Sequence, residues 1–202
     1  MEGINELNLY KLFENIITKS KVMKRFIVAT AYGNEINKNN VGEVLTDILG
    51  GITDGIKYPL CIMFPPVEML EDYDKGWSRF KCRMFFITTE FNNRNGLQSA
   101  NFNNNLSKHT IQMTWKDMRL CAVDFRRVFK EITEKNLNAG IRDGQSFDVI
   151  DRYSDIGNDR VAGVGISFDV DVFLGCGISD YSDSDINSII INTKDLHPSH
   201  DH

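Results

Sequence analysis

The sequence contains no run of apolar residues long enough to cross a membrane. Its longest apolar segments, Leu60–Val67 and Met84–Ile87, are far shorter than the ~20 residues that a membrane-spanning helix needs. The first residues, Met1–Glu6, are acidic and lack the basic and then apolar pattern of a signal peptide. We therefore expect a soluble protein that does not enter a membrane and is not secreted.

The sequence also lacks a surplus of basic residues. It has 23 Lys and Arg against 28 Asp and Glu, a formal net charge of −5. A protein that binds nucleic acid over much of its surface needs cations to neutralise phosphate groups. The charge balance disfavours that class of protein and leaves only a local basic patch open.

Cysteine is sparse, and the four cysteines form no C-x-x-C pair. Cys61 and Cys82 fall in apolar segments typical of strands, Cys121 falls in a helical segment, and Cys176 lies near the end of the chain. Disulfides persist mainly in secreted proteins, and this chain carries no secretion signal. We therefore expect reduced thiols in the core rather than disulfides.

Sequence motifs that carry catalysis are missing as well. The chain has no P-loop, zinc-protease, serine-hydrolase or EF-hand spacing. Of its four histidines, His109 falls at the start of a helix, and His197, His200 and His202 lie close to the C-terminus. The last three could chelate a divalent metal, but their place beside Pro198 is typical of a mobile tail rather than of pre-placed zinc ligands. We expect no catalytic residue, no metal site and no cofactor site.

Short glycine and acidic clusters are the remaining weak signals of a binding site. Gly163-Val164-Gly165 and Gly175-Cys176-Gly177 lack the third glycine of a phosphate-binding loop. Strand irregularities or places of close backbone approach explain them better. Two acidic groups could hold Ca²⁺ weakly, but solvated turns are the commoner explanation. These groups are Glu68, Glu71, Asp72 and Asp74, and Asp180, Asp183 and Asp185.

The composition is that of a folded protein with a core, 42% hydrophobic and 25% charged in 202 residues. Apolar residues three and four positions apart predict an amphipathic helix over 7–26 and a longer one over 108–134. Frequent Gly and Asn predict a long loop over 29–57, with a short helix at 41–49. A strand is predicted at 58–64, ended by Pro65-Pro66, and a second strand at 78–89. A hairpin is predicted from strands at 147–153 and 161–173, with its turn at 155–159.

The strand predicted at 78–89 alternates in character. Phe80, Cys82, Met84 and Phe86 form one apolar face, while the other face begins with basic residues and ends with Phe85 and Ile87. A strand that is apolar on both faces must be covered on both sides. Phe85 and Ile87 are therefore candidates for a subunit interface, unless a second helix covers the sheet.

The last predicted strand, 161–173, has the cleanest two-residue period in the sequence. Its even-numbered apolar residues are expected to point inward, and Ser167, Asp169 and Asp171 outward. After residue 174 the chain becomes rich in Ser and Asp, and it contains Ile189, Ile190 and Ile191. We predict a domain over 1–174 and an extended acidic, His-containing arm over 175–202 that is ordered only against a partner.

The order of these elements (helix, long loop, two strands, long helix, two strands) is accompanied by three characteristic segments. They are 26–34 (FIVATAYGN), 57–64 (KYPLCIMF) and 158–164 (NDRVAGV). In this order they resemble the post-helix aromatic-Gly segment, the aromatic-Pro-Leu first strand and the Asn-x-x-x-Ala-Gly segment of the tail-terminator and tail-completion proteins of tailed bacteriophages, including neck ring proteins of Bacteroides-infecting phages. Val164 stands where that family has an aromatic residue, and the similarity covers about residues 7–174.

The resemblance implies an α+β fold, a small mainly antiparallel four-stranded sheet packed against two helices, with a long loop and an extended C-terminal arm. It also implies a structural virion protein, assembled in the host cytoplasm, that forms a homo-oligomeric ring of six or twelve copies in the head–tail neck or at the tail end. Such a ring adjoins other neck, portal and tail proteins, and DNA passes through its channel without sequence-specific binding. The family has no catalytic residues, so the resemblance implies none in this chain.

The chain's own residues suggest where such a ring would make its contacts. The acidic balance suits a channel through which DNA slides, and Asp169 and Asp171 are the candidate channel-lining residues; a simple solvent-facing strand explains them as well. Phe85, Ile87 and Ile189–Ile191 are the candidate subunit interface. The alternative function is a host-encoded soluble binding module, in which the acidic loop and the His-rich tail recruit a metal or a basic partner.

Overall fold

The structure is a computed structural model, and it describes residues 6–30, 40–53, 57–69, 76–89, 104–135, 140–147 and 150–173. Across these residues it contains three helices and six strands, all in one mixed sheet. The helices are α1 (Glu6–Thr18), α2 (Val41–Gly50) and α4 (Asn104–Lys135). The strands are β1 (Arg25–Val28), β2 (Leu60–Met69), β3 (Trp77–Thr89), β4 (Ile141–Phe147), β5 (Asp151–Ile156) and β6 (Val161–Phe173).

The strands follow the order β1-β2-β3-β6-β4, and β5 pairs with the same edge of β6 as β4 does. β1 runs parallel to β2, and the other pairs are antiparallel. The α+β class is confirmed, but the expected sheet of four mainly antiparallel strands with two helices is wrong. A parallel pair needs a crossover connection, and α2 provides it between β1 and β2.

The first helix is shorter than its apolar pattern indicates. It ends at Thr18, because the Ser20 hydroxyl then accepts hydrogen bonds from the backbone N–H groups of Val22 and Met23, at 3.2 and 3.3 Å. A serine side chain that binds nearby backbone in this way favours a turn over a helix. The residues that follow form β1, whose Phe26 pairs with Cys61 of β2.

Pro65 and Pro66 do not end the strand in which they lie. The β2–β3 register shifts between Phe64 and Val67, so the prolines occupy a β-bulge and pairing resumes as far as Met69. β1 pairs with β2 only as far as Met63, so no strand among the described residues pairs with β2 on that side at the prolines. A proline is tolerated where no partner strand requires its missing N–H group.

The predicted hairpin is partly right. β6 spans the predicted residues 161–173, and its turn from β5 contains Gly157 with φ 65°. The single arm predicted at 147–153 is wrong, because β4 and β5 are separate strands along the two halves of β6. Its residues 148 and 149 lie outside the described part of the chain.

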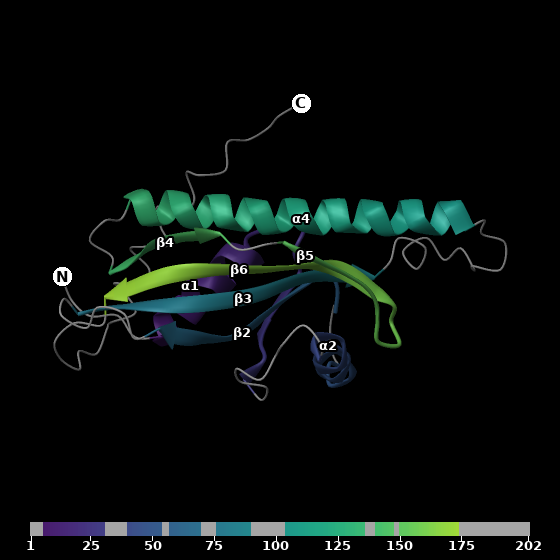
Figure 1. Cartoon of the computed structure of the whole chain (residues 1–202), viewed down its shortest axis with the longest axis horizontal. Coiled ribbons are helices and arrows are strands. Elements are labelled where there is room, and N and C mark those ends of the chain that lie inside the picture. The colour runs from purple at the N-terminus through teal and green to yellow at the C-terminus, as the bar shows by residue number, and fades with distance from the viewer. Residues whose placement is uncertain are drawn as a thin grey trace, which may run out of the picture.

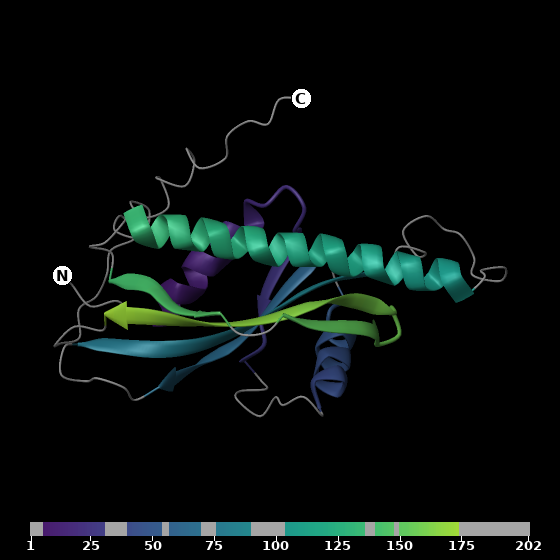
Figure 2. The same ribbon diagram turned by 45° about the horizontal axis from the view of Figure 1, so that its top comes forward.

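α1 and α4 cover one face of the sheet, and α2 covers part of the other (Figures 1 and 2). The first layer is centred on Phe13 of α1, which is 0% exposed and meets Phe125, Phe129 and Phe168 with ring centroids 5.3, 5.4 and 5.7 Å away. Aromatic pairs at these distances and inclined angles stabilise beyond the area they bury. α4 supplies the predicted apolar stripe, with Met118, Ala122, Phe129 and Ile132 at most 2% exposed.

The last strand comes very close to its neighbour at Gly163. A Cβ atom on Gly163 would lie 2.0 Å from the carbonyl oxygen of Phe86 and 2.8 Å from the Cα atom of Ile87. No other residue type fits this position without displacing β3 or β6. The expectation of close backbone approach at this glycine is confirmed.

Candidate functional site

Within the described part of the chain, helix α2 covers the second face of the sheet along only part of its length. α2 packs over Leu60, Ile62, Phe85 and Ile87, which are all 0% exposed. Figure 1 shows α2 below one end of the strands, and none of the described helices lies below the other end. The uncovered part is the candidate site, because it carries charged instead of apolar side chains.

Six charged residues share this uncovered part, which we call the charged half-face. Side chains two positions apart on a strand point the same way, and the register places Arg79 opposite Asp171 and Lys81 opposite Asp169. Arg142 of β4 pairs with Asp171 from the far side of β6. The charged half-face consists of Arg79, Lys81, Arg83, Arg142, Asp169 and Asp171.

Asp171 is the centre of a charged network across three strands. Arg79 binds it through two nitrogens, with Nε 2.7 Å from Oδ1 and Nη2 3.3 Å from Oδ2. Arg142 donates from Nε to Oδ2 at 3.0 Å. A bidentate arginine–carboxylate contact fixes the relative orientation of the two side chains as well as stabilising the pair. The network therefore joins β3, β6 and β4 at the end of the sheet that α2 does not reach.

Acids and bases on this face differ in their access to solvent. The side chain of Asp171 is 8% exposed, whereas those of Arg79 and Arg142 are 36% and 56% exposed. Asp169 is 6% exposed, Lys81 is exposed and Arg83 is half-buried. Asp171 lies beneath Arg79 and Arg142, and Asp169 packs closely against the backbone of β4 at Gly144, so the most exposed charged side chains of the charged half-face are its cations.

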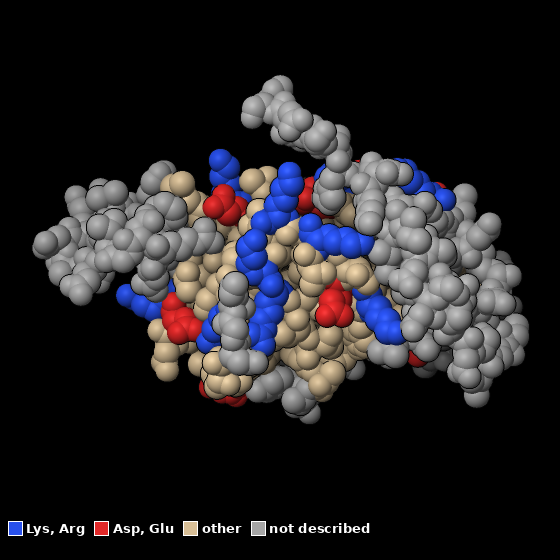
Figure 3. All heavy atoms as spheres, turned by 180° about the vertical axis from the view of Figure 1, so that it is seen from behind, with Lys and Arg blue, Asp and Glu red and all other residues tan. Residues whose placement is uncertain are grey.

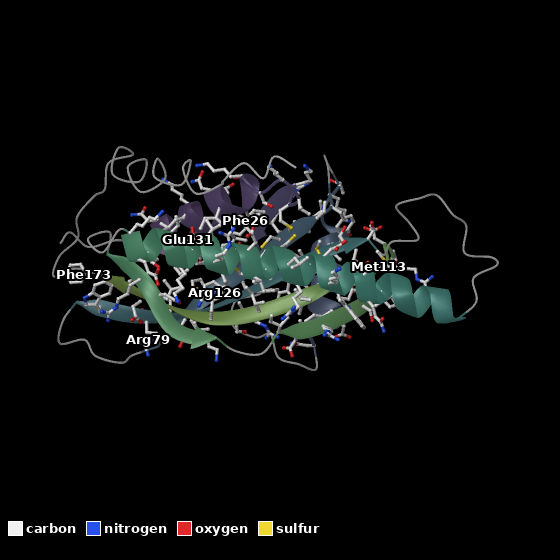
Figure 4. The ribbon with its side chains drawn as sticks, turned by 90° about the horizontal axis from the view of Figure 1, so that it is seen from above. Phe26, Arg79, Met113, Arg126, Glu131 and Phe173 are labelled. Atoms are coloured by element: carbon white, nitrogen blue, oxygen red, sulfur yellow. The ribbon has the colours of Figure 1, made fainter. Side chains whose placement is uncertain are left out.

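Two aromatic rings close this end of the sheet. The guanidinium of Arg142 lies over the ring of Trp77, 4.3 Å from its centroid, and Trp77 in turn packs on Phe173 at 5.4 Å. A cation so close to an aromatic face is attracted by the ring quadrupole. Figure 4 shows Arg79 and Phe173 at this same end of the molecule.

The outer face of α4, away from the sheet, is the second surface with unusual chemistry. Met113, Leu120 and Val123 are 39%, 54% and 41% exposed and fall on one side of the helix by their spacing. Figure 4 looks down on this helix from above, with Met113 and Glu131 toward its two ends. We call these three residues the outer ridge.

Past the outer ridge, the same helix carries paired charges. Arg127 contacts Asp124 at 2.6 Å and Glu131 at 3.0 Å, and all three side chains are at least 32% exposed. On the opposite flank, Arg126 is buried between α4 and β4, where it binds Asp143 at 2.9 Å (Figure 4). Arg126 thus fastens β4 to the helix, while the exposed pairs leave the outer face of this end polar.

A small pocket lies between α1 and α4. Its volume of about 30 Å³ is that of about one water molecule. It is lined by Leu12, Ile16, Met23 and Phe125 and, at its rim, by Lys19 and Asp124, among others. A space of this size holds no substrate of ordinary dimensions.

A polar cluster fastens the start of β2 to the β5–β6 turn. Asp159 accepts hydrogen bonds from Lys57 at 2.6 Å and from the Tyr58 hydroxyl at 2.8 Å. The hydrogen bonds from Lys57 and Tyr58 lower the pKa of the Asp159 carboxyl below its ordinary value of 3.8. Burial, followed by the bond to Asp159, raises the pKa of Tyr58 far above its usual range. The cluster stays charged on Asp159 and neutral on Tyr58 at physiological pH.

Two features often used to assign function, a metal-ligand cluster and a membrane-spanning helix, are not found among the described residues. No three His, Cys, Asp or Glu side chains among them lie close enough together to hold a metal ion. No helix in the described ranges is long and apolar enough to span a membrane. Cys61 and Cys82 are buried free thiols and Cys121 is a half-buried one, as expected, and burial raises the pKa of Cys61.

The candidate interface residues divide into two groups. Phe85 and Ile87 are covered by α2 of the same chain, so the second helix, and not a neighbouring subunit, accounts for their apolar character. Ile189, Ile190 and Ile191 lie outside the described residues, as do His197, His200, His202 and the arm as a whole. The residues of the acidic loop from Glu71 to Asp74 lie outside them too.

The candidate channel-lining acids lie on the face expected of them but not in the expected environment. Asp169 and Asp171 share the second face of the sheet with Arg79 and Lys81, yet they are only 6% and 5% exposed. The expectation that they face solvent is wrong, because Arg79 and Arg142 lie over Asp171 and β4 packs against Asp169 at Gly144. The alternation of β3 already places Arg79, Lys81 and Arg83 on one face, and that pattern was the available signal for this site.

Comparisons with known protein families, with curated proteins and with solved structures find no match to this chain. Its function must therefore be inferred from the arrangement of its own residues and from the resemblance described above.

Proposed function

We propose that this chain is a structural subunit that forms a ring with copies of itself, in the head–tail neck or at the tail end of a tailed bacteriophage. The observation that carries the proposal is that the three segments behind the resemblance are neighbours in the fold. Segments 26–34 and 57–64 pair as the parallel strands β1 and β2, over Arg25–Val28 and Leu60–Met63. Segment 158–164 begins at the turn that Lys57 and Tyr58 bind.

This convergence matters because the segments are short. In the fold these stretches form one side of the α2 layer. Tyr58, Leu60, Ile62 and Val161 all contribute to the same apolar cluster. The resemblance therefore concerns one continuous structural unit, which supports a shared fold at this end of the sheet.

Self-association is supported by the outer ridge. Exposed apolar side chains that gather on one face are typical of protein–protein contacts, and Met113, Leu120 and Val123 are three of the five large hydrophobic residues that stand out as exposed in the described chain. A contact between this ridge and a different surface of the next copy is heterologous, and such contacts close into rings when the rotation between copies is right.

The first test is quantitative mass spectrometry of density-purified tailed particles from the source of the sequence. The proposal expects this chain at a small fixed stoichiometry relative to the portal protein, near the six or twelve copies that the resemblance implies. Absence from intact particles would overturn the virion function.

The second test addresses self-association in the purified full-length chain. Leu120→Asp with Val123→Asp is expected to abolish ring formation seen by native mass spectrometry and negative-stain microscopy. Val22→Asp is the matched control, because Val22 is an equally exposed apolar residue, at 47%, in the turn after α1. Rings that survive the α4 substitutions, or that are lost equally in the control, would show that the outer ridge does not join the copies.

A further inference from the structure

We infer that the charged half-face binds the phosphate backbone of double-stranded DNA without reading its sequence. The inference rests on the proposed function only for the identity of the anion, since a ring around a DNA channel brings duplex DNA close to its subunits. The residues that carry it are Arg79, Lys81, Arg83 and Arg142.

The exposed charge of this face has the sign that a polyanion requires. Four cations share the face with three carboxylates: Asp169 and Asp171, which are 6% and 5% exposed as whole residues, and Asp151 of β5, which is half-buried and pairs opposite Gly165 on the same side of the sheet. Arg142 is 56% exposed and Arg79 is 36% exposed at the side chain. An approaching polyanion thus meets cations first, although the formal net charge of the whole chain is −5.

The cations form a row that can follow a phosphate backbone. Arg79, Lys81 and Arg83 follow one another on β3 at intervals of about 7 Å, twice the rise of a strand. Arg142 lies two strands from Arg79, but the guanidinium groups of both arginines converge on the carboxylate of Asp171. Arg142 therefore widens one end of the row.

The guanidinium of Arg142 is held in place before any ligand arrives. It is fixed between the carboxylate of Asp171 and the ring of Trp77. Within the described residues its contact with Asp171 uses Nε alone, and a guanidinium carries five N–H donors in all. The N–H groups on its two terminal nitrogens can therefore serve a phosphate, with little loss of side-chain entropy.

A second group of cations lies at a different place. Lys19, Lys21 and Lys24, at the end of α1 and in the turn after it, are exposed. Figure 3 shows Lys and Arg side chains in a band across the middle of the face seen from behind, the side on which α1 lies. These lysines lie on a turn rather than on paired strands, so ordering them on a ligand costs more entropy. Replacing Lys21 and Lys24 therefore tests whether DNA binds at this second group of cations instead of at the charged half-face.

The test measures binding of the full-length chain to a fluorescently labelled DNA duplex by anisotropy, over a series of salt concentrations. The variant is Lys81→Gln with Arg83→Gln, which leaves the Asp171 network intact. The matched control is Arg127→Gln with Lys130→Gln on α4, which removes the same charge from a surface outside the proposed site. Thermal unfolding followed by circular dichroism verifies that each variant is folded.

The expected result is a wild-type affinity that falls with salt and is insensitive to DNA sequence. The slope of log K against log salt should fall by about 0.9 for each phosphate that the protein no longer neutralises, so by up to about 1.8 in the Lys81 and Arg83 variant. The Arg127 and Lys130 control should keep the wild-type slope.

Several outcomes would overturn the inference. The first is that the wild-type chain does not bind DNA at low salt. The second is that the affinity falls equally in the Lys81 and Arg83 variant and in the Arg127 and Lys130 control. The third is that the affinity falls only when Lys21 and Lys24 are replaced. Poly-glutamate that competes as well as DNA at equal charge would assign the face to an acidic protein instead. A chain present in particles at fixed stoichiometry but inert toward DNA would sink this inference alone. A chain absent from particles that still binds DNA through this face would sink the proposed function alone.

Discussion

Replacing both arginines that bind Asp171 is expected to destabilise the protein by more than the two single replacements combined. The Asp171 side chain is only 8% exposed, and Arg79 and Arg142 contact it at 2.7 and 3.0 Å. In Arg79→Gln or Arg142→Gln the carboxylate keeps one cation. In the double variant it keeps neither, and the buried charge is uncompensated.

The magnitudes follow from exposure. Each single replacement removes a pair whose arginine is partly solvated, which costs about 1 kcal/mol. Arg142→Gln also removes the cation from the ring of Trp77, whose centroid is 4.3 Å away, worth about 0.5 kcal/mol more. Leaving a buried carboxylate without its partners costs about 3–5 kcal/mol. The cost of the double replacement should therefore exceed the sum of the two single costs by about 0.5–2.5 kcal/mol.

The assay is urea unfolding of the full-length chain at neutral pH, for the wild type, the two single variants and the double variant. A further variant adds Asp171→Asn to the double replacement, and it should recover at least about 1 kcal/mol because a buried amide carries no charge. Additive costs, or no recovery with Asp171→Asn, would refute the view that the buried carboxylate needs these cations.

Three further expectations concern stability, each measured by urea unfolding. Gly163→Ala should destabilise the protein by about 1–3 kcal/mol or more through overpacking, because its Cβ atom would lie 2.0 Å from the carbonyl oxygen of Phe86. Gly42→Ala is the control and should be neutral or stabilising, because a Cβ atom there has nothing within 4 Å. Equal effects of the two substitutions would contradict the close approach at Gly163. Phe13→Ala should cost about 3–5 kcal/mol in the same assay, since it is fully buried; a decrease under about 1 kcal/mol would mean that α1 packs loosely. The hydrogen bond from Lys57 lowers the pKa of Asp159 in the folded state. The wild type should therefore be more stable than Asp159→Asn at neutral pH, and this difference in unfolding free energy should vanish as the pH falls below 3.8. A difference that persists in acid would exclude this cause.

Much of the fold could be predicted because some segments have one strong period over many residues. The 32-residue helix α4 and the 13-residue strands β3 and β6 were found from spacing alone. In such segments burial repeats every 3.6 or two residues, so local pattern and tertiary packing agree. Gly163 was also interpretable, since a glycine within an apolar strand indicates close backbone approach.

The errors fall where tertiary neighbours override a local signal. β1 has only four residues, and its apolar side chains continue the helical pattern of α1, so only pairing with β2 defines it. Pro65 and Pro66 end an isolated strand but are tolerated in a bulge with no neighbour on one side. β4 and β5 share one edge of β6, an arrangement that no local period encodes.

For the candidate site, the sequence by itself determined which side chains share a face. Residues two apart on a strand point the same way, so the alternation of β3 and β6 placed Arg79 and Lys81 on one face of their strand and Asp169 and Asp171 on one face of theirs. It also predicted the buried, reduced thiols of Cys61 and Cys82.

Only the tertiary structure decided how those faces are covered. Sheet register set Arg79 against Asp171, and β4 added Arg142 from a distant part of the chain, so the acids became buried and the cations outermost. α2 in the same way took Phe85 and Ile87 into the chain's own core. The physical reason is that side-chain direction is a local property of the backbone, whereas exposure depends on contacts between segments far apart in the sequence.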